Sequence, residues 1–321
     1  MESRLEPLAA AQHSILFRSQ LLAAGYSDDE ISRRIRRNDW TAIRRGAYVE
    51  THVWDSLDAV QRHRVLTIAV VKQLKVPAVP SHVSAAVMLG MAVWDLDLTV
   101  VHVTRQDRHA SRFEAGVMHH AARLPPSDLC VVDGITVTGP LRTAVDIART
   151  APFEQSVVVA DGALARSGKD RDGLFATFER MRTWSGARGA GRVVEFADGN
   201  AESVGESRAR VQFERIGLPR PRLQYVIQAP NGETFRPDFY FEAEHTLGEF
   251  DGRSKYFAYL GPGEDPAEVV WREKRREDML RDMGYGVARL VWKDLNDDAT
   301  VRERFRAAFE RTRRSARRGL R

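Results

Sequence analysis

The chain has 321 residues, 43% hydrophobic and 29% charged, which describes a globular protein long enough for two or three domains. Its single cysteine, Cys130, excludes an intramolecular disulfide and argues against a zinc–thiolate site. The net charge is +5, but the last twenty residues hold nine arginines and two glutamates, so the rest of the chain carries −2. Such a basic tail suits a nucleic-acid contact or a solvated terminal helix.

Nothing in the sequence has the pattern of a membrane span or a signal peptide. No run of about 18 apolar residues is present, and the N-terminal MESRLEPLAA lacks a charged-then-apolar order. We therefore expect a cytoplasmic protein with no membrane partner. Only six of the 49 basic residues are lysine, which gives added weight to Lys255 and Lys274.

The first predicted elements are two helices and a β-hairpin. Apolar spacing indicates a helix over 12–24, and Ser27 with Glu30 forms a capping box that opens a second, basic helix. Residues 40–49 read as a hairpin. This order is typical of a winged helix-turn-helix, whose second helix enters the major groove while hairpin arginines lie along phosphates. The alternative is a small helical subdomain with a solvated arginine face. The candidate DNA-binding residues are Arg33, Arg34, Arg36, Arg37, Arg44 and Arg45.

The run SQLLAAGYSDDEISRRIRRNDWTAIRRGAYV resembles the N-terminal domain of AbiEi-type antitoxins, the regulatory partners in type IV toxin–antitoxin systems. This resemblance implies DNA binding, autorepression and a cognate toxin as partner. It carries no catalytic residues with it.

The middle region, 53–198, alternates predicted helices and strands and ends in SGARGAGR, 185–192, a glycine-rich basic stretch that we interpret as a linker. The block GITVTGPLRTAVDIART, 134–150, predicts a strand that leads into a helix at Pro140. It resembles the middle region of the same antitoxin-like proteins.

Two polar pairs stand out in the middle region. Adjacent residues on a strand point to opposite faces, so His119 and His120 cannot share a metal unaided. Arg142 and Asp146 are four residues apart on the predicted helix, which favours a surface ion pair.

The stretch RPDFYFEAEHTLGEFDG, 236–252, carries the strongest chemical signal. Two strands with alternating apolar and polar residues would bring Asp238, Glu249 and Asp251 to one edge of a sheet. Carboxylates that lie together repel each other unless a cation neutralises them, and their hard oxygens suit Mg²⁺ or Mn²⁺. The alternative is a solvated hairpin whose acids face water.

The surrounding elements predict a compact domain around this stretch. A helix over 201–217 precedes strands over 222–228, 235–241 and 247–251, and a helix over 266–283 precedes a last strand near 287–292. This is the order α-β-β-β-α-β. Residues 200–295 resemble the PD-(D/E)XK nuclease superfamily, and its short-patch-repair (Vsr-like) endonuclease branch above all.

The resemblance implies a site formed by Glu206, Asp238 and Glu249. The position at which the superfamily has lysine is Asp251, so Lys255 or Lys274 would have to supply that charge.

The sequence thus predicts a multidomain α/β protein with a winged helix in 1–52, an α/β middle region in 53–198 and a restriction-endonuclease-like αβββαβ domain with a basic C-terminal helix in 199–321. We expect a DNA-binding protein that hydrolyses DNA phosphodiester bonds with Mg²⁺ or Mn²⁺. The alternative is an antitoxin-type repressor with a degenerate nuclease fold. The expected catalytic residues are Glu206, Asp238, Glu249 and Lys274, and the expected metal ligands are Asp238, Glu249 and Asp251.

Overall fold

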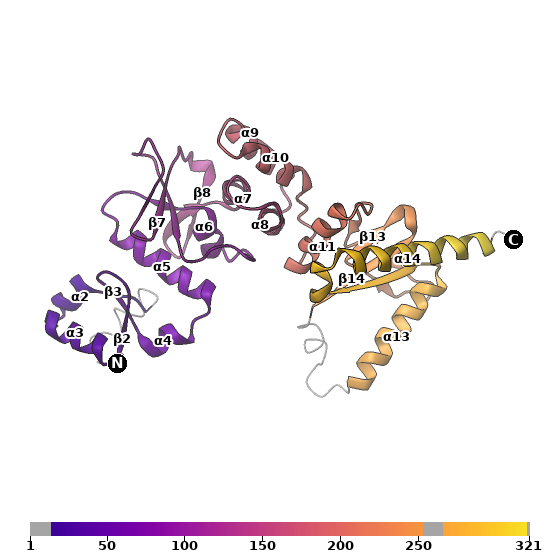
Figure 1. Cartoon of the computed structure of the whole chain (residues 1–321), viewed down its shortest axis with the longest axis horizontal. Coiled ribbons are helices and arrows are strands. Elements are labelled where there is room, and N and C mark those ends of the chain that lie inside the picture. The colour runs from indigo at the N-terminus through magenta and orange to yellow at the C-terminus, as the bar shows by residue number, and fades with distance from the viewer. Residues whose placement is uncertain (1–13, 253–265, 320–321) are drawn as a thin grey trace. The chain divides into compact units, whose positions relative to one another are not determined.

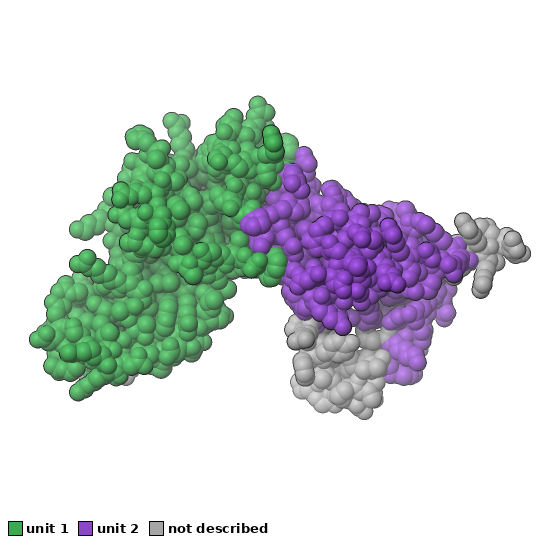
Figure 2. Space-filling model, viewed as in Figure 1, with its two compact units in different colours: residues 1–151, 172–191 green, residues 152–171, 192–321 purple. Residues whose placement is uncertain are grey.

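The computed structural model describes residues 14–252 and 266–319, which form two compact units (Figure 2). Unit 1 comprises Met1–Ala151 and Asp172–Gly191, and unit 2 comprises Pro152–Arg171 and Arg192–Arg321. Each unit is mixed α/β, with helices packed on small sheets (Figure 1).

The units do not follow the expected boundaries after residues 52 and 198. The N-terminal region shares one hydrophobic cluster with the middle region, in which Ile15 and Val49 pack with Ile68 and Val137. Because these side chains are buried together, the two regions form one body rather than two independent domains.

The helix α8 (Phe153–Arg166) belongs to unit 2, although the expected middle region included it. Its Asp161 is buried and accepts hydrogen bonds at 2.7 Å from Ser207 Oγ, Arg210 Nη1 and the Asp198 backbone N–H. Burial raises the pKa of the Asp161 carboxyl, and Arg210 opposes that shift. These bonds attach α8 to the helix that carries Ser207 and Arg210.

Unit 1 is built from short elements around three small sheets, ordered β1-β3-β2, β4-β5-β7-β6 and β8-β9. Its helices are α2 (Arg18–Ala23), α3 (Asp28–Arg36), α4 (Thr51–Ser56), α5 (Ala59–Gln73), α6 (His82–Met88), α7 (Pro140–Ala148) and most of α9 (Arg171–Met181). Its strands are β1 (Leu16–Phe17), β2 (Trp40–Arg44), β3 (Ala47–Glu50), β4 (Val79–Pro80), β5 (Val101–Arg105), β6 (Arg112–Glu114), β7 (Val117–Ala121), β8 (Leu129–Val132) and β9 (Ile135–Thr138).

The start of unit 1 confirms one prediction and corrects another. The capping box opens α3, since the Glu30 N–H donates to Ser27 Oγ and the Ser27 N–H donates to Glu30 Oε2. The helix expected over 12–24 is shorter, because Leu16 and Phe17 pair with β3 as a strand and α2 begins only at Arg18. Burial against β3 outweighs the helical spacing of the apolar residues here.

The stretch 185–192 does contain a division between the two units, after Gly191, but it is not an extended linker, because α10 (Ala187–Phe196) begins within it. Gly186 adopts a left-handed conformation, φ +81°, and its α-carbon lies close to the Arg149 backbone. A Cβ on Gly191 would stand 3.1 Å from the Phe178 ring. The glycines therefore permit close packing, which composition alone does not distinguish from flexibility.

Unit 2 has a four-stranded sheet of order β10-β13-β14-β15, in which β14 and β15 are parallel and the other pairs antiparallel. Its further helices are α11 (Val204–Arg215), α13 (Pro266–Asp282) and α14 (Asp298–Gly319). Its strands are β10 (Arg222–Leu223), β11 (Ile227–Gln228), β12 (Thr234–Phe235), β13 (Phe239–Phe241), β14 (Thr246–Asp251) and β15 (Gly286–Val291), and β11 pairs with β12 alone.

Helices cover both faces of this sheet (Figure 1). One face packs Phe239 of β13 against Phe213 of α11 and Phe305 of α14. The other packs Leu247 of β14 against Leu280 of α13. Alternate residues of β14 point to opposite faces, so Glu249 and Asp251 follow Leu247 on the face of α13.

Candidate functional site

Two acids of unit 2 meet where β13 begins and β14 ends. Phe239, the first residue of β13, lies opposite Gly248 in the antiparallel register; Asp238 directly precedes Phe239 in the chain, and Glu249 directly follows Gly248. The Phe250 N–H donates to Asp238 Oδ2 at 2.7 Å, which holds this carboxylate at the end of the sheet. Asp238 is 9% exposed and Glu249 8%. The fold therefore makes neighbours of two residues that lie eleven positions apart in the sequence.

Among the described residues, two arginines lie beside Glu249 and Asp251. Arg276 of α13 lies 2.9 Å from Glu249 Oε1. Arg289 of β15 lies 3.5 Å from Glu249 Oε2 and 3.3 Å from Asp251 Oδ2. The parallel register of β14 and β15 puts Arg289 directly next to Glu249. The protein's own cations thus offset the repulsion among the acids.

Glu206 is 2% exposed in the first turn of α11, where its N–H donates to Ser203 Oγ, the N-cap of the helix. Its Oε1 accepts from Ser203 Oγ at 2.8 Å, and its Oε2 accepts from the Glu202 N–H at 2.9 Å. Gln224 Nε2 also donates to Oε2, at 3.1 Å, while the Gln224 N–H donates to the Asp238 carbonyl. Glu206 is therefore linked through Gln224 to the backbone of Asp238, and both of its carboxylate oxygens accept hydrogen bonds.

Of the two candidate lysines, the structure describes only Lys274. Lys274 is exposed on α13, two residues before Arg276. Two residues span about 200° of an α-helix, so Lys274 faces away from the side on which Arg276 meets Glu249. Lys255 lies outside the described residues.

Sequence reasoning missed Arg276 and Arg289. A charged residue inside the apolar strand 287–292 was the available signal for Arg289, since Ala288 and Leu290 on either side of it are buried. Its partners could not be named, because the sequence does not reveal that β15 pairs with β14 in parallel.

The basic face of α3 is largely exposed in unit 1. Arg33, Arg36 and Arg37 are exposed, whereas Arg34 is half-buried and pairs with Asp39 across 3.3 Å. The three exposed guanidinium groups are accessible to an anionic ligand.

The two hairpin arginines differ from each other. Arg45 is exposed. Arg44 donates from Nε to Gln73 Oε1 at 3.1 Å and from Nη1 to the Ala115 carbonyl at 3.0 Å. Arg44 thus attaches the hairpin to the middle of unit 1 and has a structural role there.

The pair Arg142–Asp146 is buried, contrary to the expected surface pair. Arg142 is 3% exposed and Asp146 1%, with Nε 2.9 Å from Oδ2, and a second acid, Asp128, lies 2.8 Å from Arg142 Nη1. Burial raises the pKa of Asp146 to about 6, although Arg142 opposes the shift. The prediction was wrong because α7 is enclosed by other elements, which the i, i+4 spacing does not reveal.

Within residues 14–252 and 266–319, no helix is both long enough and apolar enough to cross a bilayer.

No protein-family model matches the chain. The chain is 31% identical over 164 residues to two uncharacterized proteins of Mycobacterium tuberculosis, one from strain CDC 1551 / Oshkosh and one from strain ATCC 25618 / H37Rv. The aligned part is 51% of this chain and 58% of each relative, so the chain spans little more than half the length of the curated relatives that it matches.

Proposed function

We propose that this protein binds DNA through a winged helix in unit 1 and hydrolyses phosphodiester bonds through a PD-(D/E)XK-like, Vsr-like nuclease fold in unit 2. The observation that carries the proposal is the convergence of two buried acids at the end of the sheet: Asp238 accepts a hydrogen bond from the Phe250 N–H on β14, and the neighbouring Glu249 lies beside Arg276 and Arg289. The expected strands 222–228 and 235–241 are each split, and β11 and β12 form a separate hairpin, but the four-stranded sheet and its helices follow in the order α11, β10, β13, β14, α13, β15, which supports the same fold independently of the acids.

The donor set fits a divalent cation, because Asp238 and Glu249 offer hard carboxylate oxygens from adjacent strands. Mg²⁺ or Mn²⁺ would polarise a phosphoryl oxygen and activate water when bound there. Asp251 occupies the superfamily's lysine position, so Arg289, on the neighbouring strand β15 beside Glu249, would supply the positive charge that stabilises negative charge on the phosphoryl group. Glu206 positions Gln224 and the start of β13 rather than the reacting atoms.

A second function, that of a repressor without nuclease activity, is favoured by the partners that the acids already have. Both oxygens of Glu249 already face arginine, and both oxygens of Glu206 accept hydrogen bonds. A site compensated in this way needs no ion, which favours an antitoxin-like repressor that keeps a degenerate nuclease fold for binding DNA or a toxin.

Plasmid cleavage separates the two functions. The purified chain is incubated with supercoiled plasmid and Mg²⁺, Mn²⁺ or EDTA, alongside Asp238→Asn and Glu249→Gln. The control is Asp282→Asn, which changes an exposed acid at the end of α13. We expect metal-dependent nicking that falls at least about 100-fold in both site variants and is unchanged in the control.

Nicking that persists in both site variants would show that the site assignment is wrong. Binding of DNA without cleavage by any of the proteins would establish the repressor instead.

The DNA-binding role predicts different effects for exposed and engaged arginines. Arg33→Ala with Arg37→Ala should weaken DNA binding and lower the slope of log K against log [salt] by about 2, because each phosphate contact contributes roughly 0.9. Fluorescence anisotropy between low and moderate salt measures the slope. Arg182→Ala, a change of a mostly exposed arginine of unit 1, serves as the control. An unchanged slope in the double variant would exclude α3 from the DNA interface.

A further inference from the structure

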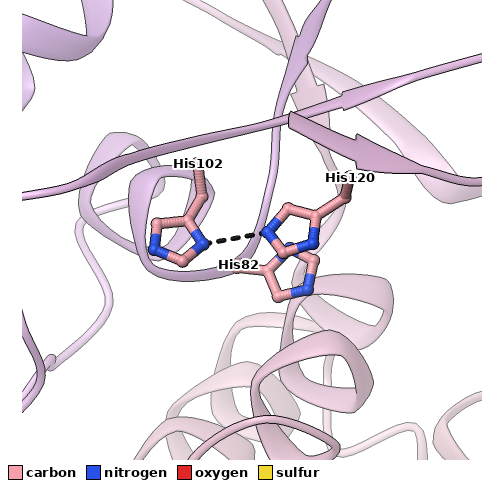
Figure 3. A group of neighbouring side chains, drawn as sticks. All are labelled: His82, His102 and His120. Atoms are coloured by element: carbon pink, nitrogen blue, oxygen red, sulfur yellow. Dashed lines mark hydrogen bonds between the residues drawn. The ribbon is translucent and has the colours of Figure 1, made fainter. Parts of the chain in front are cut away.

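Three histidines from three separate elements of unit 1 meet at one point (Figure 3). His102 on β5 and His120 on β7 lie on adjacent parallel strands, with His102 Nδ1 3.0 Å from His120 Nε2. His82, the first residue of α6, stacks on His120 with ring centroids 3.7 Å apart and planes 14° apart. One ring nitrogen of each histidine lies within 4.8 Å of the other two.

The strand register explains which histidines take part. Val103 is opposite His119 and Thr104 is opposite His120, so side chains alternate along both strands and His120 shares a face with His102. His119 points to the other face, as expected for the adjacent pair. The partners of His120 come from elements 18 and 38 residues earlier in the chain, so sequence spacing did not indicate them.

His82 is held firmly in its place. Its backbone is left-handed, φ +50°, a conformation that costs a residue other than glycine of order 1 kcal/mol or more. Its Nδ1 lies 3.0 Å from Ser81 Oγ, and Thr104 Oγ1 donates to the same oxygen at 2.8 Å. When Nδ1 donates to Ser81, the lone pair of His82 is on Nε2. A hydrogen bond that fixes the tautomer and ring orientation in this way is the usual support of a histidine that binds a metal.

The electrostatics keep the three rings neutral. Burial lowers the pKa of His82 well below its ordinary range, that of His102 to about 4 and that of His120 to about 3, and the neighbouring histidines add to the effect. Arg149 and Arg142 oppose a cation at this place, but Asp146 pairs with both arginines. Neutral imidazoles keep a lone pair for a metal at physiological pH.

We propose that His82, His102 and His120 bind a borderline transition-metal ion, Zn²⁺ in the first instance, with water at a fourth position. Three histidines and an open position form a known zinc arrangement, and imidazole donors favour Zn²⁺ over Mg²⁺. His102 and His120 are half-buried rather than fully buried.

Binding requires a small local rearrangement. Nitrogens around a tetrahedral zinc ion are roughly 3.3 Å apart, given Zn–N bonds of about 2.0–2.1 Å, whereas the His102 and His120 nitrogens are 3.0 Å apart and all three lie within 4.8 Å of one another, so the spacings must adjust by tenths of an ångström or more. The His102–His120 hydrogen bond gives way to the ion, and the His82 ring tilts off its stack on His120 while Nδ1 stays hydrogen-bonded to Ser81, so that Nε2 turns toward the ion. The alternative is a hydrogen-bonded histidine cluster that binds no metal, and it predicts no response to Zn²⁺.

The test is metal titration of the tag-free full chain after EDTA treatment and desalting. Co²⁺ absorption in the visible range reports coordination geometry, and competition with a zinc indicator reports affinity. We expect one equivalent of Co²⁺ with tetrahedral absorption, displaced by Zn²⁺, and a higher melting temperature with Zn²⁺. His82→Gln, His102→Gln and His120→Gln should each weaken Zn²⁺ binding at least about 100-fold, and Ser81→Ala about 10-fold.

Two controls locate the site. His119→Gln removes the adjacent histidine that points to the other face, and Asp238→Asn removes an acid of unit 2. Both should keep Zn²⁺ binding, and circular dichroism identifies variants that fail to fold. Absence of Co²⁺ and Zn²⁺ binding at 100-fold excess over protein, or unchanged binding in folded histidine variants, would overturn the proposal. Loss of binding in Asp238→Asn alone would assign the ion to unit 2 and would overturn it equally.

Discussion

The histidine cluster of unit 1 and the acid–arginine cluster of unit 2 keep polar groups away from water in opposite ways. In unit 1, burial lowers the pKa of His102 and His120, so the rings are neutral. In unit 2, Glu249 is nearly buried and lies between Arg276 and Arg289. The histidines of unit 1 are therefore uncharged, whereas the carboxylates of unit 2 are charged and are balanced by arginines.

This difference bears on what each cluster can bind. Neutral imidazoles present lone pairs without a local charge, so an incoming metal ion competes only with a hydrogen bond. A compensated carboxylate has an arginine to displace before an ion can approach it closely. We therefore expect unit 1 to respond to Zn²⁺ at low concentration and unit 2 to respond to Mg²⁺ only at millimolar concentration.

Lowering the pH should have the largest effect on the free energy of unfolding. Histidines with a depressed folded-state pKa bind fewer protons than in the unfolded chain, so stability falls as the pH drops from about 6.5 to about 4. Asp146, with a pKa of about 6, acts in the opposite direction over the same range. Taking His102 and His120 against Asp146 alone, the net loss in the free energy of unfolding is on the order of 4 kcal/mol, and His82, whose pKa burial also lowers, acts in the same direction. Urea unfolding between pH 4 and 7 measures it.

The double variant His102→Gln with His120→Gln tests whether these two histidines cause the loss of stability at low pH. It should flatten the pH dependence of the unfolding transition, whereas His52→Gln, whose side chain is 78% exposed, should leave it as in the wild type. A double variant that keeps the full dependence would show that other groups cause it.

Removing the arginine that Glu249 and Asp251 share in unit 2 should lower the free energy of unfolding by a smaller amount. Arg289→Met leaves Glu249 and Asp251 without a shared cation and should lower the free energy of unfolding by about 2 kcal/mol, less than for a fully buried pair because Arg289 is 30% exposed. If these acids bind a divalent ion, millimolar Mg²⁺ should raise the melting temperature of this variant more than that of the wild type.

The matched control for Arg289→Met is Arg281→Met. Arg281 pairs with Glu277 and Asp278 on α13 but is 57% exposed, so its loss should cost less than about 1 kcal/mol. Equal effects of the two substitutions would mean that Arg289 does not compensate the acids.

Short-range signals in the sequence correctly placed several elements. The box at Ser27 and Glu30 opens α3, Pro140 begins α7, and the strand expected over 247–251 is β14. The helix expected over 266–283 is α13, which ends at Asp282, and Gly284 with φ +85° stands two residues beyond it. Caps, prolines and glycines act through the backbone within a few residues, so their effect is readable without the fold.

Alternation along β14 also placed Glu249 and Asp251 on one face, because the strand period of two is a property of the backbone. The partners of these acids depended on how strands pair. Arg289 reaches Glu249 through the parallel β14–β15 register, and Arg276 does so from a helix packed over that face.

The features that only the tertiary structure decided join residues far apart in the chain. His82, His102 and His120 become neighbours when α6 packs on β5 and β7, and Arg142 is buried with Asp146 because other elements enclose α7. The glycines of 185–192 could indicate either a flexible linker or a tightly packed helix, and packing against Phe178 and Arg149 selected the helix. Composition and spacing describe what a residue can do locally, whereas burial and partners are set by contacts across the fold.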